Sequence, residues 1–206
     1  LKWARVGAGV IRHYNEGWAN GYHFGIRYWE IWNEPDNEPD PARNPMWQGT
    51  KEDYFRLYET TSNYLKSRFP SLRIGGYAGC GFYALSEADY AAVAKSSTRT
   101  GYFVEFFHEF LRYISSPAHK SPLDFFSWHS YAGVPETAAY ARYARETLDS
   151  YGFTNTENIL NEWNRGLELR GTARDAAEIA AMFCAMQAGP VDLCVYYDGQ
   201  VNTAYG

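Results

Sequence analysis

The sequence predicts an α/β fold on a parallel sheet, as part of a (β/α)8 barrel. Short runs of β-branched and aromatic residues alternate with helical segments along the whole chain, without an obvious linker, and this alternation is typical of βαβ units. We identify five strands in 206 residues, whereas a closed (β/α)8 barrel needs about 250 residues. A doubly wound sheet would suit the length, but no G-x-G-x-x-G turn follows the first strand and no P-loop occurs.

The helices are predicted from apolar residues spaced three and four apart and from capping signals. They are expected at 3–18, 50–69, 103–114, 135–151 and 172–189, and the residues 86–89 are expected to open a further short helix. Thr50 with Asp53, and Thr172 with Asp175, have the spacing of a capping box. Gly152 stands where a helix C-terminus favours glycine. The first helix has no capping residue before it, so we expect the chain to be a fragment.

The strands are predicted from dense apolar and aromatic runs that glycine, proline or asparagine bound. They are expected at 26–32, 72–77, 123–131, 158–163 and 191–197. A helical segment separates each strand from the next, which predicts parallel pairing with right-handed crossovers.

Composition excludes several classes of function. The chain has 19 basic and 24 acidic side chains and a net charge of −5, so it lacks the positive surface that binds nucleic acid or an anionic membrane. No run approaches the roughly 18 apolar residues of a membrane span, and three scattered cysteines form no disulfide or zinc pattern. His13, His23, His108 and His119 show no metal-ligand spacing, so we expect no metal and no cofactor. Aromatic residues make up 18%, which is consistent with a site for flat ligands such as sugars.

Polar side chains follow the predicted strands at the point where each strand ends. Asn33 and Glu34 follow the first strand, His129 and Tyr131 end the third, and Glu162 ends the fourth. Parallel α/β folds build their sites at this edge. Two carboxylates are the equipment for cleaving a glycosidic bond, because one protonates the leaving oxygen while the other meets the sugar carbon. Glu34 and Glu162 are therefore the candidate catalytic pair.

Two carboxylates that share a site cannot have the same pKa. At about 5.5 Å and an effective dielectric constant of about 20, their repulsion is about 3 kcal/mol, or roughly two pKa units. One of the two is therefore expected to stay protonated near neutral pH. Spacing in the sequence does not decide which one.

The segment WEIWNEPD resembles the acid/base segment after the fourth strand of clan A glycoside hydrolases, and above all the pattern of family 39. In that pattern a Trp-Asn-Glu-Pro stretch precedes a capped YFxLYxxT helix. This sequence has WNEPD, then MWQGTKEDYFRLYETT, SWHSY and NEWN in the same order. The resemblance covers essentially the whole chain. It implies that residues 1–206 are an incomplete catalytic barrel from the third helix to the eighth strand, poorly soluble and inactive alone.

The resemblance also implies roles for individual residues. Glu34 would be the acid/base, with the raised pKa, and Glu162 the nucleophile of a retaining mechanism. Asn33 would contact the sugar 2-hydroxyl, while His129 and Tyr131 would orient the sugar and the nucleophile. Trp163, next to Glu162, is a further candidate for substrate binding through sugar stacking.

The implied activity is cleavage of terminal β-glycosides, with a β-xyloside as the first candidate and an oligosaccharide or glycoside as the partner. Family 39 also contains α-L-iduronidases, which need a cation for the substrate carboxylate, and Arg165 could supply it. Asn161 and Gly75-Gly76-Tyr77 depart from the usual Thr and Gly-Gly-Pro of the family, which leaves the sugar open. A non-catalytic carbohydrate-binding barrel is the alternative from another class of function.

Other carboxylates near the candidate pair have simpler interpretations. The sequence NEPD occurs twice, at 33–36 and 37–40, but only the first copy directly follows a strand, so Glu38 is expected on a solvated loop. Asp36, Glu38 and Asp40 lack the glycine and terminal glutamate of a calcium-binding loop. Glu30 lies deeper on the same strand face as Glu34 and is expected to be a paired structural carboxylate.

Overall fold

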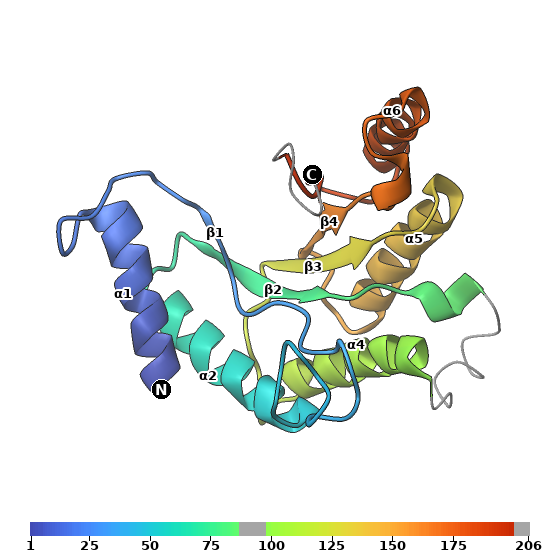
Figure 1. Ribbon diagram of the computed structural model, residues 1–206. Coiled ribbons are helices and arrows are strands. Elements are labelled where there is room, and N and C mark those ends of the chain that lie inside the picture. Colours follow the sequence, from blue (N-terminus) through green and yellow to red (C-terminus); the bar gives the residue numbers. More distant parts are fainter. Residues whose placement is uncertain (87–97, 200–206) are drawn as a thin grey trace.

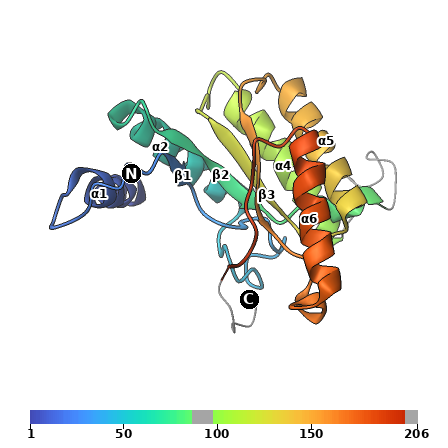
Figure 2. The same cartoon turned by 90° about the horizontal axis from the view of Figure 1, so that it is seen from above.

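The computed structural model describes residues 1–86 and 98–199 and shows a five-stranded parallel sheet (Figure 1). The strands are β1 (Tyr28–Glu30), β2 (Arg73–Gly79), β3 (Phe125–Ser130), β4 (Glu157–Trp163) and β5 (Leu193–Cys194). Each strand pairs in parallel with its neighbour along the chain, in the order β1-β2-β3-β4-β5. Helices lie between successive strands on the outside of the sheet (Figures 1 and 2). This arrangement confirms the predicted partial (β/α)8 barrel.

The helices follow the predicted positions closely. They are α1 (Lys2–Glu16), α2 (Lys51–Arg68), α4 (Arg99–Ser115), α5 (Val134–Ser150) and α6 (Ala173–Ala188), with 3-10 helices η1 (Tyr83–Ser86) and η2 (Leu167–Leu169). The helix predicted at 86–89 lies outside the described residues, apart from Ser86, which ends η1. Among residues 1–86 and 98–199, no helix combines the length and the apolar character that crossing a bilayer requires.

Side-chain caps explain where two of the helices begin. At α2 the Thr50 hydroxyl accepts from the Asp53 N–H at 3.1 Å, and the Asp53 carboxylate accepts from the Thr50 N–H at 3.0 Å, so the predicted capping box is confirmed. At α6 only half of the predicted box forms, because the Thr172 hydroxyl accepts from the Asp175 N–H at 3.1 Å without a return bond from the Asp175 side chain. One satisfied N–H is enough to start that helix.

The two outer strands are shorter than predicted, and both are edge strands. β1 covers 28–30 instead of 26–32, and β5 covers 193–194 instead of 191–197. Each pairs on one side only, β1 with β2 and β5 with β4, so fewer hydrogen bonds hold it extended. After β1 the backbone turns at Trp32, which has a φ of 76°, and this turn starts the loop that carries Glu34.

Aromatic side chains fill the core between the sheet and its helices. Phe107 of α4 stacks on Phe126 of β3 with ring centroids 4.4 Å apart, and Tyr58 of α2 meets Phe110 at 4.8 Å. Buried Tyr54 donates its hydroxyl to the Ile31 carbonyl at 2.8 Å. Much of the aromatic content therefore builds the core.

Candidate active site

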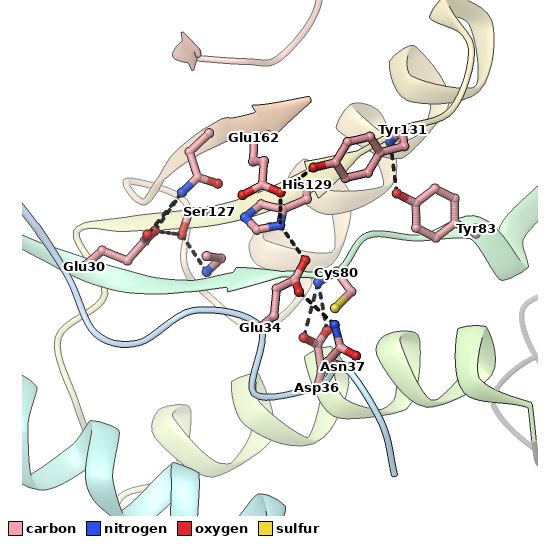
Figure 3. Close-up of polar contacts among 12 residues, drawn as sticks. Glu30, Glu34, Asp36, Asn37, Cys80, Tyr83, Ser127, His129, Tyr131 and Glu162 are labelled. Atoms are coloured by element: carbon pink, nitrogen blue, oxygen red, sulfur yellow. Dashed lines mark hydrogen bonds and ion pairs between the residues drawn. The ribbon is translucent and has the colours of Figure 1, made fainter. Parts of the chain in front are cut away.

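Side chains from three strands meet at the carboxyl edge of the sheet (Figure 3). Glu34 follows β1, His129 is on β3, and Glu162 is on β4. One polar atom from each of these three side chains lies within 4.8 Å of the others. Residues that are 128 positions apart in the sequence thus face each other, as the predicted catalytic pair requires.

The loop after β1 places Glu34 by continuing along β2. The Ile31 N–H donates to the Gly75 carbonyl at 2.9 Å, and the Glu34 N–H donates to the Ala78 carbonyl at 3.0 Å. Between these two bonds the chain turns at Trp32, and Glu34 itself has a left-handed φ of 48°, which is uncommon for a residue other than glycine. The carboxylate of Glu34 consequently points toward His129 (Figure 3).

Gly75 keeps β2 and β3 close enough together for this geometry. A Cβ atom at Gly75 would lie 2.1 Å from the carbonyl oxygen of Phe125, so no larger residue fits without moving a strand. The first glycine of the pair in this strand is thus explained by a close approach of two backbones.

An irregularity in β4 sets the position of Glu162. Trp128 pairs with Leu160 and His129 pairs with Glu162, so Asn161 is an extra residue on β4 between these pairs. A bulge of this kind changes which side chains face each other across two strands. Here it places Glu162 beside His129, with 3.6 Å between Glu162 Oε1 and His129 Nδ1.

Each carboxylate oxygen of Glu34 has a nitrogen-bearing partner, and the Cys80 side chain is a further hydrogen-bond partner of this carboxylate. His129 Nδ1 lies 2.8 Å from Oε1, and Asn37 Nδ2 donates to Oε2 at 2.8 Å. Burial raises the pKa of Glu34, but the hydrogen bond and charge of His129, together with the Asn37 bond, outweigh it and leave that pKa below its usual value. This corrects the expectation of a raised pKa at Glu34. Repulsion between the two carboxylates raises that pKa, but the imidazole of His129 lowers it.

The neighbouring carboxylates favour the protonated form of His129. Its side chain is 1% exposed, and burial alone would lower its pKa. The bond to Glu34 and the charges of Glu162, Glu34 and Glu30 outweigh burial, so the pKa of His129 is raised. Because an ionised carboxylate only accepts hydrogen bonds, Nδ1 carries the hydrogen that points at Glu34. Nε2 is buried and has no hydrogen-bond partner among the described residues.

Tyr131 contacts Glu162. Its hydroxyl donates to Glu162 Oε1 at 2.5 Å, and its backbone N–H donates to the Tyr83 hydroxyl at 3.0 Å. Burial and the Glu162 carboxylate raise the pKa of Tyr131 well above its usual value, so the hydroxyl stays a donor. Tyr131 can therefore orient Glu162.

Asn33 and Trp163 are the other two residues that were predicted to bind substrate. Asn33 is half-buried and directly precedes Glu34 in the loop. Trp163 has no exposed surface and packs edge-on against Phe183 and Tyr196, with ring centroids 5.2 and 5.0 Å away. A sugar has no ring face of Trp163 to stack on, which corrects the prediction that Trp163 binds substrate.

Asn37 and Asp36 are part of the site, although the sequence analysis did not assign them. Asp36 is fully buried and accepts from the Cys80 N–H at 3.1 and 3.2 Å; burial and nearby Glu34 raise the pKa of Asp36 to about 7, despite the Cys80 bonds. The available signal was the second NEPD copy, since Asn37 is its first residue. Glu38 of that copy instead pairs with Arg43 at 2.9 Å.

Glu30 forms a polar layer below the catalytic pair. Its carboxylate accepts from the Ser127 hydroxyl and from Asn161 Nδ2, the latter at 3.1 Å to each oxygen (Figure 3). The partners of this carboxylate, which was expected to be paired, are thus a hydroxyl and an amide. Asn161 thus has two functions, since it forms the bulge and contacts Glu30.

Glu34, His129 and Glu162 are also the residues that could hold a metal ion, since each offers a ligand atom within 4.8 Å of the others. Hydrogen bonds already account for their placement, because His129 bonds Glu34 and Tyr131 bonds Glu162. The expectation that no metal is needed stays a prediction.

Comparison with known proteins decides the family. The sequence profile of "Glycosyl hydrolases family 39" matches residues 1–198. The chain belongs to family 39. Among curated proteins, a β-xylosidase from Geobacillus stearothermophilus is 29% identical over 151 residues. That alignment covers 70% of this chain but 23% of the relative, so the chain spans about a quarter of the curated protein that it matches.

This chain likewise covers only part of the solved structures that it resembles. A glucosidase from Croceicoccus marinus is 26% identical and superposes with a TM-score of 0.73, covering 95% of this chain and 37% of its own. A GH39 β-xylosidase from Caulobacter crescentus is 21% identical with a TM-score of 0.62, covering 95% and 38%. The second likeness shows the fold alone.

Proposed function

We propose that the chain carries the catalytic pair of a retaining glycosidase, with Glu34 as acid/base and Glu162 as nucleophile. The observation that carries the proposal is the proximity of the two carboxylates, which present oxygens within 4.8 Å of each other. Retaining enzymes hold their carboxyl groups about 5–5.5 Å apart, whereas inverting enzymes leave about 6.5–9.5 Å for a water. The spacing in this site favours a retaining mechanism.

The first step would form a bond between Glu162 and the anomeric carbon as the glycosidic bond breaks, and the leaving oxygen takes a proton from Glu34. The resting pair of Glu34 and His129 holds that proton on Nδ1, 2.8 Å from Glu34 Oε1. Its transfer from Nδ1 to Oε1 gives the acid form. In the second step water attacks the same carbon, gives a proton to Glu34 and releases Glu162.

A terminal β-xyloside is the proposed substrate, because the curated relative is a β-xylosidase. An iduronidase-like activity would need a cation available for the substrate carboxylate. Arg165 is already engaged by Glu178, with 3.0 Å between Nε and Oε2, so it does not favour that alternative.

The stereochemistry of azide rescue tests both roles at once. In Glu162→Gly, turnover of an aryl β-xyloside should be lost, and azide should enter from the nucleophile's face to give a glycosyl azide of inverted configuration. In Glu34→Ala, a substrate with a good leaving group still forms the covalent intermediate. Azide should then give product of retained configuration. NMR of the glycosyl azide product gives its configuration. The reactions use the complete polypeptide, meaning one that also supplies the rest of the barrel.

Glu38→Ala is the matched control, since it removes a carboxylate from the same loop and should keep wild-type turnover. An inverted azide from Glu34→Ala would reverse the assigned roles. Binding of xylosides with no release of the aryl group by the complete polypeptide would favour the carbohydrate-binding alternative instead.

A further inference from the structure

The second NEPD copy contacts the acid/base residue of the first copy. Asn37 Nδ2 donates to Glu34 Oε2 at 2.8 Å, and the Asn37 backbone N–H donates to the Glu34 carbonyl at 3.1 Å (Figure 3). His129 contacts the other oxygen, Oε1. The two oxygens of Glu34 therefore have different partners, one an amide and one an imidazole.

Arg99 determines which end of the Asn37 amide faces Glu34. Its Nη2 donates to Asn37 Oδ1 at 2.9 Å, and its Nε donates to the Asn37 backbone carbonyl at 2.5 Å. A guanidinium has only donors, so Oδ1 must face Arg99 and the NH2 group must face Glu34. Arg99 opens α4 and its guanidinium lies 5.1 Å from the ring centroid of Phe103. A helix, rather than the loop itself, thus fixes the amide.

This orientation makes the two oxygens of Glu34 chemically unequal. The Asn37 NH2 group donates and does not accept, and the hydroxyl oxygen of a protonated carboxyl group accepts more weakly than its carbonyl oxygen. The acid form therefore favours its proton on Oε1, which leaves Oε2 as the carbonyl oxygen that accepts from Asn37. Oε1 lies 2.8 Å from His129 Nδ1 and is thus the one that faces the proton on the imidazole.

We propose that Asn37, oriented by Arg99, is a positioning residue that assigns the transferable proton of Glu34 to Oε1. The proposal rests on the proposed role of Glu34 as acid/base. It gives the second NEPD copy a role in the site, because Asn37, the asparagine of the second copy, positions Glu34, the glutamate of the first copy.

Several titratable groups, from other elements and from the same loop, face Glu34 as well. They are His129 of β3, Glu162 of β4, Tyr131 after β3, Asp36 of the same loop and Cys80 after β2. The Asn37 amide differs from all of them because it is neutral at every pH. Its removal takes a donor from ionised Glu34 without changing the net charge of the site, so the pKa of Glu34 should rise.

The test compares Asn37→Ala, Arg99→Met and wild type in the complete polypeptide. ¹³C NMR of the Glu34 carboxylate should show its titration midpoint raised by about one unit in Asn37→Ala. Arg99→Met should shift it in the same direction but less, because the amide remains and is only free to rotate. Hydrolysis of xylosides with poor leaving groups, which need the acid, should fall about tenfold more than hydrolysis of activated ones.

Arg43→Met is the matched control, since it removes another exposed arginine side chain from contacts with the same loop. A Glu34 midpoint in Asn37→Ala equal to that in Arg43→Met would overturn the proposal, as would an equal loss for good and poor leaving groups. If the complete polypeptide hydrolyses no glycoside, the proposed function fails. The NMR comparison still decides the role of Asn37, because a shifted midpoint supports it and an unshifted one overturns it.

Discussion

Glu34 and Glu162 are identical side chains whose surroundings differ. Glu34 is bonded by an imidazole and an amide, while Glu162 is bonded by a phenol. This arrangement favours the protonated imidazole of His129, since its pKa is raised while that of Glu34 is lowered. Such coupled groups titrate as a pair. In the proposed mechanism, the proton for general acid catalysis would thus belong to the pair rather than to one carboxylate.

Removing the charge of Glu34 should lower the pKa of His129. In Glu34→Gln the buried imidazolium loses its bonded anion, while burial, which opposes the charged form, stays the same. The titration midpoint of His129, raised above 6.5 in the wild type, should therefore fall. ¹⁵N NMR of the imidazole measures it. Glu38→Gln, which removes a carboxylate paired with Arg43, should leave the midpoint in place; equal midpoints in both variants would contradict the pairing.

At the scale of the element, the start of α2 depends on one threonine. Thr50→Ala removes the acceptor for the Asp53 N–H and half of the capping box, which should lower the free energy of unfolding by about 1 kcal/mol. Urea denaturation measures the loss. Thr154→Ala, an exposed threonine in a loop, should change stability far less, and a similar loss in both variants would show that the cap is not the cause.

The element scale also shows what sequence patterns can predict. The capping box, the apolar strand runs and the order of the strands follow from local residue patterns, because each depends on residues near one another in the chain. The bulge at Asn161 and the left-handed Glu34 depend on contacts with other strands. The effect of His129 on Glu34 likewise needs a distance across the sheet. Hence both carboxylates could be predicted, whereas their protonation and the role of Asn37 could not.

On the scale of the whole molecule, the half barrel has apolar surface at its N-terminal side. Val6, Val10 and Tyr14 lie four residues apart along α1 and are 65%, 41% and 38% exposed. Trp18 and Phe24, which follow α1, are 49% and 62% exposed. β1 and β5 also pair on one side only. Contiguous apolar surface and open strand edges favour association with other chains.

The chain of residues 1–206 alone should therefore self-associate, and a charge on the apolar face of α1 should weaken that association. Val10→Glu places a carboxylate in the row formed by Val6, Val10 and Tyr14, where desolvation on contact is costly. Sedimentation velocity should show a smaller weight-average mass than for the unsubstituted chain. Ala139→Glu adds the same charge to an exposed position of α5 and controls for net charge. If both variants reduce the mass equally, general repulsion is the cause and the α1 face is not the contact.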